Sequence, residues 1–536
     1  MRQFLATTLM AAMTFGPLTN ANAAAAAAPA KSAGGSAATP IQHLVVIFQE
    51  NVSFDHYFGT YPRALNTSPG EPKFFPSPFT PTINGLSDGL LTNNPNLNPA
   101  NLDGATNPFR LGRAQAWTAD QDHDYGPEQA AFDGGLMDLF PLSVGTAGPP
   151  PGFGPPVVRT TGLTMGYYDG NTVTALWNYA QAYAMNDNSY GTNFGPSTPG
   201  AINVVAGQTD GVIQNIDSDF AVVPDGNGGL TLVSDSDPVG DVCSGSSQVQ
   251  MGGQNVGDLL TSAGVTWGFF EGGFDLTLTN PNGTTGCQRS HASQFIGTNK
   301  ADYIPHHQPF QYYTSTANLQ HTRPTSVSMI GHNGDAANHQ YDIHDFFDAV
   351  NAGNYPAVSY LKAPGYQDGH AGYSTPLDEQ VFITQVINFL QTKPDWTSTA
   401  VIIAYDDSDG WYDHQLGQIV NQSQTSQDML NGPGFCGHAA PALAGVSGDH
   451  AQGRCGYGPR LPFLIVSPFA RPNFVDHTLT DQSSIVRFIE DNWLGGQRIP
   501  GSFDAVAGTL NNMFVFGEPS RQRLILNENT GEVRSR

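Results

Sequence analysis

Two apolar runs that end in acidic residues constrain this chain most strongly. Residues 44–48 lead directly into Glu50 and Asn51, and residues 400–405 lead into an Asp-Asp pair at 406–407. Continuous β-branched and apolar runs are typical of strands that are buried on both faces, as in a parallel sheet. Ligands of open α/β sheets bind beyond the carboxyl ends of the strands, so these polar side chains stand where a hard cation or a phosphate binds.

Each run also has a purely structural interpretation. Asn51 or Ser53 can cap a helix after the first strand, and residues 406–413 can be an acidic surface loop. Consecutive strand residues face opposite sides, so both aspartates reach one ion only if the chain turns, which Gly410 allows. The occurrence of two such strands favours a shared site.

The second half of the chain alternates predicted helices and strands. We expect strands at residues 266–270, 358–361, 400–405 and 461–466, and helices at 174–185, 256–263, 378–390 and 480–493, the last with Thr480 as a candidate cap. This alternation predicts an α/β fold, an α/β/α sandwich with a mostly parallel central sheet. The Pro-, Asn- and Gly-rich residues 61–156 predict long loops, and residues 220–233 predict a β-hairpin insertion.

The start of the chain predicts export. Residues 1–23 have a basic start, an apolar run and a small-residue cleavage site, which is a signal-peptide pattern; residues 24–40 form an Ala/Gly/Ser tether, and residues 41–536 form one domain with insertions. No later run approaches the roughly 18 apolar residues of a membrane span. We therefore expect a soluble, secreted or periplasmic protein without a transmembrane anchor.

Cysteine usage agrees with export. The four cysteines are an even number, which favours two disulfides, and no short CxxC spacing indicates a zinc ribbon. Neighbours in sequence suggest Cys243 with Cys287 and Cys436 with Cys455, although three connectivities are possible.

The excess of acidic residues makes some classes of binding partner improbable. In 536 residues, 21 Lys and Arg stand against 46 Asp and Glu, a formal charge of -25. This balance argues against a broad nucleic-acid or anionic-membrane footprint. A phosphate site in such a chain needs a metal and histidines rather than an arginine cluster.

Four histidines and one serine are candidates for that chemistry. The histidines are His123, His306, His307 and His370. A histidine beside carboxylates keeps its proton more readily, and an imidazolium can hold phosphate oxygens or protonate a leaving group, although each histidine alone is more often structural. Ser197 lies in a Gly-Pro-Ser turn before the apolar residues 202–206, which we interpret as a strand; it is either an ordinary turn residue or a nucleophile that a metal or base activates.

Three motifs in this order resemble a known family. Residues 50–59, the Asp-Gly-His motif at 368–370 and residues 405–410 are similar to the bacterial phosphoesterase family of phospholipases C and secreted acid phosphatases, over residues 41–493. The resemblance implies an alkaline-phosphatase-like α/β/α fold and metal-dependent hydrolysis of phosphomonoesters or phosphodiesters through a covalent phospho-enzyme.

The resemblance also implies roles for individual residues. The metal ligands are Glu50, Asn51, Asp406 and Asp407 together with the nucleophile Ser197. The phosphoryl pocket is lined by His123, His306, His307 and His370. The roles of Asp409 and His414 stay open.

The chain departs from the family pattern at two places. Val52 replaces the Arg or His that follows Glu-Asn, which removes a cation near the metal. In the phospholipase branch the corresponding segment resembles Gly-Pro-Thr-x-Pro-Asn-Arg. This chain has Ser197 at the threonine position and Ala201 at the arginine position. A serine without a following arginine looks more like the acid phosphatase branch, with Thr198 as an alternative nucleophile. The chain also ends soon after Trp493, without room for the accessory domains of many family phospholipases.

The sequence therefore predicts a secreted metal-dependent acid phosphatase that hydrolyses small phosphomonoesters through a phosphoserine. An all-oxygen ligand set suits one divalent ion, Ca²⁺, Mg²⁺ or Mn²⁺, with Zn²⁺ tolerated. One of His306, His307 or His370 protonates the leaving alcohol, and protonated histidines favour an acidic optimum. The alternatives are a phospholipase C or other phosphodiesterase with the same site, and a secreted binding protein without activity.

Overall fold

An eight-stranded sheet organises the chain in the computed structural model, which describes residues 37–145, 161–226, 228–437 and 453–535. The strand order is β14 (Gln340–Asp342), β11 (Trp267–Glu271), β15 (Val358–Lys362), β1 (His43–Gln49), β16 (Thr399–Tyr405), β17 (Phe463–Val466), β4 (Ala184–Asn186) and β18 (Phe474–Asp476). Within this sheet only β17 runs antiparallel to its neighbours. The prediction of a mostly parallel sheet is confirmed.

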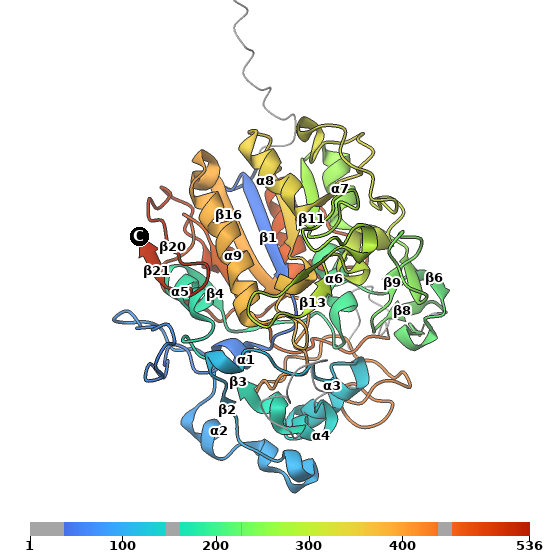
Figure 1. The fold of residues 1–536 in the computed structure, drawn as a ribbon. Helices are drawn as coiled ribbons and strands as arrows, with labels where there is room; N and C mark the ends of the chain where they lie inside the picture. Colours follow the sequence, from blue (N-terminus) through green and yellow to red (C-terminus); the bar gives the residue numbers. More distant parts are fainter. Residues whose placement is uncertain (1–36, 146–160, 227, 438–452, 536) are drawn as a thin grey trace, which may run out of the picture. The chain divides into compact units, whose positions relative to one another are not determined.

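Helices cover both faces of this sheet. The larger helices are α5 (Thr174–Ala182), α6 (Ser197–Ala206), α7 (Val256–Ala263), α8 (Ile343–Asn351), α9 (Pro376–Gln391) and α10 (Ser483–Trp493). Tyr360 and Ile402 are both register partners of Val46 and share one face, whereas Tyr405 lies three residues further along and faces the other way. The Tyr360 hydroxyl donates to the Val204 carbonyl of α6, and the Tyr405 hydroxyl donates to Glu379 of α9. The two helices therefore lie on opposite faces, and α8 and α9 stand in front of β1 in Figure 1.

The strands are buried because both faces are covered. Every residue of β15, β16 and β17, and residues 44–49 of β1, are buried. The long helix α9 begins with Thr375 as N-cap and a proline in its first turn, and the Thr375 hydroxyl accepts from the backbone N–H groups of Leu377 and Asp378. This packing fixes the carboxyl ends of β1 and β16 side by side, with Gln49 opposite Tyr405.

Three predicted elements differ from the structure. Residues 202–206 belong to helix α6 rather than to a strand. The predicted helix at 174–185 ends at Ala182 because β4 begins at Ala184, and the closing helix begins at Ser483. Thr480 is not its cap, since β19 (Thr480–Asp481) pairs with β5 (Ser189–Tyr190).

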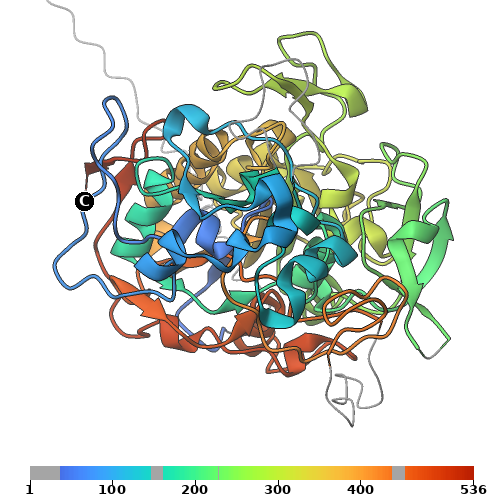
Figure 2. The same cartoon turned by 90° about the horizontal axis from the view of Figure 1, so that it is seen from below.

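Shorter elements and long loops cover the carboxyl edge of the sheet, below the end of β1 in Figure 1 and facing the viewer in Figure 2. The short helices are α1 (Phe54–Phe58), α2 (Asp88–Thr92), α3 (Tyr125–Phe132) and α4 (Phe140–Ser143). The remaining strands are β2 (Phe109–Arg110), β3 (Gly166–Tyr167), β6 (Val212–Ile216), β7 (Val222–Pro224), β8 (Leu230–Leu232), β9 (Asp237–Pro238), β10 (Gln248–Met251), β12 (Ser290–Ala292), β13 (Asn299–Ala301), β20 (Ile525–Leu526) and β21 (Val533–Ser535). The predicted hairpin is confirmed as β7 and β8, which pair antiparallel.

Both predicted disulfides are present, Cys243 with Cys287 and Cys436 with Cys455. The predicted signal peptide, residues 1–23, and residues 24–36 of the predicted tether lie outside the described residues. Among the described helices, none combines the length and the apolar character that a membrane span needs.

Candidate active site

The two predicted acidic pairs meet at the carboxyl edge of the sheet. The backbone N–H of Asn51 donates to Asp406 Oδ1 at 3.1 Å, and the N–H of Val52 donates to the Asp407 carbonyl at 2.9 Å. The chain turns sharply after each strand, since Asn51 has φ 46° and Asp409 has φ 53°. The chain therefore has the turn that Asp406 and Asp407 need in order to reach one site. Ser53, the other predicted cap, is the N-cap of α1.

Ser197 is the first residue of α6, and its side chain faces these strand ends. Ser197 Oγ lies 2.9 Å from Glu50 Oε2, 3.2 Å from Asp407 Oδ2 and 3.5 Å from Asn51 Oδ1. The neighbouring Thr198 points elsewhere, because its Oγ1 donates to Asp235 Oδ1 at 2.9 Å. The structure thus brings Ser197, and not Thr198, to the predicted ligands.

The oxygen cluster around Ser197 fits a divalent cation. A serine hydroxyl has one proton to donate, yet three acceptor oxygens surround it. Burial, together with the Glu50 carboxylate, raises the pKa of Asp407 to about 7. Burial and the Glu50 and Asp407 carboxylates raise the pKa of Asp406, which is also fully buried. Crowded buried carboxylates of this kind are stabilised by a hard cation with oxygen ligands.

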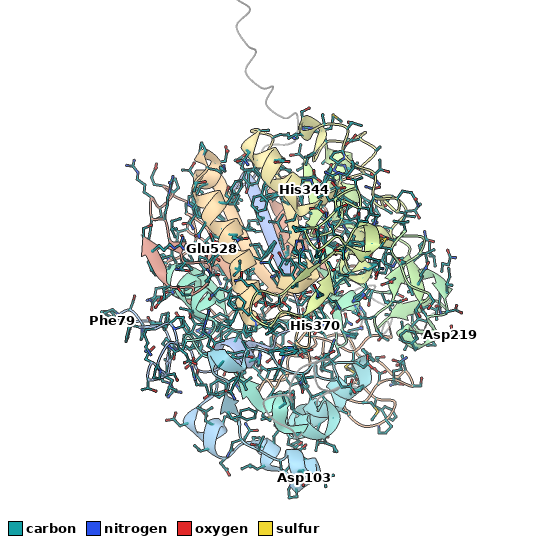
Figure 3. The ribbon with its side chains drawn as sticks, in the orientation of Figure 1. Phe79, Asp103, Asp219, His344, His370 and Glu528 are labelled. Atoms are coloured by element: carbon teal, nitrogen blue, oxygen red, sulfur yellow. A yellow bond between two sulfur atoms is a disulfide. The ribbon has the colours of Figure 1, made fainter. Side chains whose placement is uncertain are left out.

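The four predicted histidines surround this cluster at different depths. His307 Nδ1 lies 3.3 Å from Glu50 Oε1, and His123 Nε2 lies 3.3 Å from Asn51 Nδ2. The His370 ring centroid lies 6.0 Å from that of His123, and the His306 ring lies 4.6 Å from that of His307. Figure 3 shows His370 below the sheet, at the start of the loop layer.

The electrostatic surroundings divide the histidines into two pairs. Burial lowers the pKa of His123, but the Asp407 and Asp120 carboxylates offset it and raise the pKa to about 10. The pKa of His306 is also raised, because Asp235 and Asp237 outweigh burial. Burial lowers the pKa of His307 and of His370 below the ordinary value. The pKa is therefore raised in His123 and His306 and lowered in His307 and His370.

Asp409 and His414, whose roles the sequence leaves open, occupy different places. Asp409 Oδ1 lies 3.5 Å from His123 Nδ1, and the Asp409 carboxylate is buried beside that of Asp120, which raises its pKa. His414 Nδ1 lies 2.5 Å from Asp55 Oδ2, in a buried network with Arg460 and Asp413. Asp409 thus borders the histidine cluster, whereas His414 belongs to a structural ion-pair network.

Sequence reasoning missed several charged residues beside the site. Lys362, at the end of β15, is fully buried, contacts Glu50 Oε1 and lies 3.8 Å from Asp406 Oδ2. Glu128 accepts from the Gly195 N–H and from the Ser408 hydroxyl, and burial raises its pKa to about 8. The available signal was a charged residue, Lys362, directly after the predicted strand at residues 358–361.

The acidic ends of β1 and β16 therefore face the hydroxyl of the serine that begins α6, and this set of oxygens suits a divalent cation. The chain belongs to the Phosphoesterase family, whose profile matches residues 41–494. The predicted family resemblance is confirmed.

Relatives of the chain include phospholipases C. It is 25% identical to a non-hemolytic phospholipase C of Burkholderia pseudomallei over 89% of this chain and 59% of the relative. It is 24% identical to phospholipase C A of Mycobacterium tuberculosis over 90% of this chain and 78% of the relative. A non-hemolytic phospholipase C of Pseudomonas aeruginosa is 24% identical and 58% covered, so the chain spans under two thirds of the length of two of these relatives.

A solved structure was also matched. Murine ectonucleotide pyrophosphatase/phosphodiesterase 5 is 10% identical, with a TM-score of 0.31 over 64% of this chain and 95% of that chain.

Proposed function

We propose that this protein is an exported, metal-dependent acid phosphatase that hydrolyses small phosphomonoesters through a phosphoserine at Ser197. The observation that carries the proposal is the position of Ser197 Oγ, 2.9 Å from Glu50 Oε2 and 3.2 Å from Asp407 Oδ2. Family membership supports phosphoric ester hydrolysis in general.

Glu50, Asn51, Asp406, Asp407 and Ser197 hold the metal ion in this proposal. When bound, a divalent cation polarises a phosphoryl oxygen and lowers the pKa of the serine hydroxyl. Ca²⁺, Mg²⁺, Mn²⁺ and Zn²⁺ are the candidates, since the donor set consists of oxygens.

The chain's own groups position and stabilise the phosphoryl group. Ser197 attacks phosphorus in line with the leaving alcohol, and the positive end of the α6 dipole favours the negative charge of the phosphoserine. His123, which is protonated, supplies positive charge where charge builds on the phosphoryl oxygens. Water then attacks the same phosphorus and releases phosphate and Ser197.

Three histidines compete for the role of proton donor to the leaving alcohol. The raised pKa of His306 gives it a proton to donate at acidic pH, so we assign it this role. His307 and His370 have lowered pKa values and line the pocket as neutral groups that gain a proton as the pH falls. This distribution supports an acidic optimum.

The test uses purified protein with p-nitrophenyl phosphate, bis(p-nitrophenyl) phosphate and phosphatidylcholine from pH 4 to 9, with and without chelator. Monoester turnover that peaks below pH 7, requires metal and falls at least about 1,000-fold in Ser197→Ala is expected. Thr198→Val is the matched control, because it removes the adjacent hydroxyl. If activity is lost in Thr198→Val and kept in Ser197→Ala, the nucleophile is Thr198. If both variants keep full activity, the phosphoserine mechanism is refuted.

Phospholipase C activity is the second candidate, and the names of the relatives favour it. Preferential cleavage of phosphatidylcholine or of the diester assigns the chain to that activity. If no metal supports turnover and the protein binds no metal, the remaining interpretation is a binding protein without enzymatic activity.

A further inference from the structure

A small hairpin stands beside the site and carries a lysine that the proposed mechanism does not use. Strands β12 and β13 pair antiparallel, with His291 opposite Lys300. The hairpin packs against the start of α9 and the segment before it, since the Thr298 hydroxyl donates to the Tyr373 carbonyl at 3.1 Å and the Ser293 hydroxyl donates to Asp378 at 2.7 Å. The hairpin is therefore attached to the wall of the site that contains His370.

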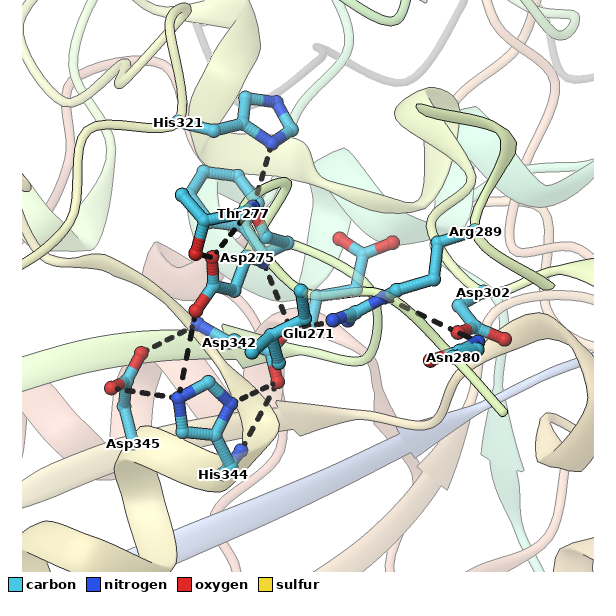
Figure 4. Close-up of polar contacts among 12 residues, drawn as sticks. Glu271, Asp275, Thr277, Asn280, Arg289, Asp302, His321, Asp342, His344 and Asp345 are labelled. Atoms are coloured by element: carbon cyan, nitrogen blue, oxygen red, sulfur yellow. Dashed lines mark hydrogen bonds and ion pairs between the residues drawn. The ribbon is translucent and has the colours of Figure 1, made fainter. Parts of the chain in front are cut away.

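Buried charges clamp the base of the hairpin (Figure 4). Arg289, just before β12, lies 3.4 Å from Asp302, just after β13, and donates to Asp342 Oδ2 at 2.7 Å. Asn280 and His291 also bond to the Asp302 carboxylate. Because Asp342 ends β14, this network ties the hairpin to the central sheet and fixes the position of Lys300.

Lys300 contacts Tyr373, whose ring stacks on His370 of the candidate site. Its Nζ lies 3.5 Å from the centroid of the Tyr373 ring, which stacks on His370 with centroids 4.4 Å apart. The Tyr373 hydroxyl donates to Asp368 Oδ2 at 3.0 Å. Gly365 makes room for the lysine, since a Cβ there would lie 3.0 Å from Lys300 Cγ. The side chain is thus held in one direction by an aromatic face.

Among the described residues, no carboxylate directly contacts the ammonium of Lys300. Within the residues that the structure describes, its Nζ makes no hydrogen bond or ion pair, although the side chain is partly buried. The carboxylates of Asp368, Glu50 and Asp120 act on it only from a distance. A partly buried ammonium without a direct counter-ion is suited to an anionic ligand.

We infer that Lys300 is a specificity-determining residue that attracts the second negative charge of a phosphomonoester and so favours monoesters over diesters. The inference rests on the proposed function and explains why the site would prefer phosphomonoesters as substrates. A monoester is a dianion above the second phosphate pKa of about 6, whereas a diester stays a monoanion.

The test compares Lys300→Met with wild type on p-nitrophenyl phosphate and bis(p-nitrophenyl) phosphate, at pH 7 and pH 5. We expect kcat/KM to fall about tenfold for the monoester at pH 7 and less than about threefold for the diester. The monoester loss shrinks at pH 5, where the substrate carries one charge less. Inhibition by inorganic phosphate at pH 7 weakens in parallel, and Lys300→Arg retains most of the preference.

Lys393→Met is the matched control, because Lys393 also lies over an aromatic ring, 4.2 Å from the Phe389 centroid, at the end of α9. Equal losses on both esters, or a monoester loss that is the same at both pH values, overturn the role of Lys300 and leave the proposed function standing. The absence of turnover of either ester by the wild type and by Lys393→Met overturns the proposed function itself. Thermal melts of all variants identify any loss that comes from misfolding.

Discussion

Lys362→Met tests whether the buried lysine and a divalent cation neutralise the same carboxylates. Lys362 and its partners Glu50 and Asp406 are all fully buried. Coulomb's law with an effective dielectric constant of about 20 gives about 4 kcal/mol for charges 3.8 Å apart. Removal of one partner of a buried pair costs about 3–5 kcal/mol, because the other charge stays buried and unpaired. We therefore expect metal-free Lys362→Met to lose about 3–5 kcal/mol in the free energy of unfolding.

Metal should reverse much of this loss. A divalent ion bound by Glu50, Asp406 and Asp407 supplies the missing positive charge, and the more negative site binds it more tightly. Urea unfolding of wild type and variant, each with chelator and with saturating metal, measures the four free energies. The expected result is a larger stabilisation by metal in the variant than in the wild type.

Equal losses with metal and with chelator would refute this reasoning, because they would show that the two cations do not share the carboxylates. Lys393→Met is again the control. Lys393 is only partly buried, and among the described residues its ammonium contacts Asn351 and the Phe389 ring, so its removal should change stability by less than about 0.5 kcal/mol.

Two further substitutions test the packing and the pH dependence around the site. In Gly200→Ala the new Cβ lies 2.2 Å from the Asp406 carbonyl oxygen, so we expect a loss of about 1–3 kcal/mol and weaker metal binding, measured by thermal melts and calorimetry; unchanged melts contradict the close contact. Burial raises the pKa of Asp378 to about 6, above its ordinary value, so its contribution to stability is full below about pH 4 and is lost as the pH rises through 6. Asp378→Asn should remove this decline of about 3 kcal/mol between pH 4 and 7 in urea unfolding, and an unaltered decline would show that another group causes it.

The strands and the ligands at their ends were predictable from the sequence because the signals are local. Residues 44–48 and 400–405 are continuous apolar runs, and their polar residues follow directly. Neighbouring parallel strands have their carboxyl ends at the same edge of the sheet, so no knowledge of distant contacts is needed to place these ends together. The positions of Glu50 and Asp407 near each other follow from this geometry.

Helix α6 could not be predicted in the same way. Ile202, Val204 and Val205 are β-branched and favour a strand in isolation. In the fold this segment is fully buried and packs against α10 and α7, and the left-handed Gly207 ends the helix. Tertiary packing therefore overrides the local preference, as it does at Thr480.

The buried cations were hidden because their partners are distant in sequence. Lys362 and Glu50 are separated by 312 residues, and no local pattern connects them. The same holds for Lys300, which contacts Tyr373 because the β12–β13 hairpin is attached to this part of the fold by the Thr298–Tyr373 hydrogen bond and by the ion pairs of Arg289.

The wide spacing of the site residues determines when during folding the site can form. Ser197 meets Glu50 across 147 residues and Asp407 across 210 residues. Contacts at such separations form late, since each closes a long loop. A nascent or cleaved chain that lacks β16 retains Glu50 and Ser197 but not Asp406 or Asp407. Under the proposed mechanism, Ser197 therefore meets the Asp406 and Asp407 carboxylates only after β16 has joined the sheet, so we expect no phosphatase activity from a chain that lacks β16.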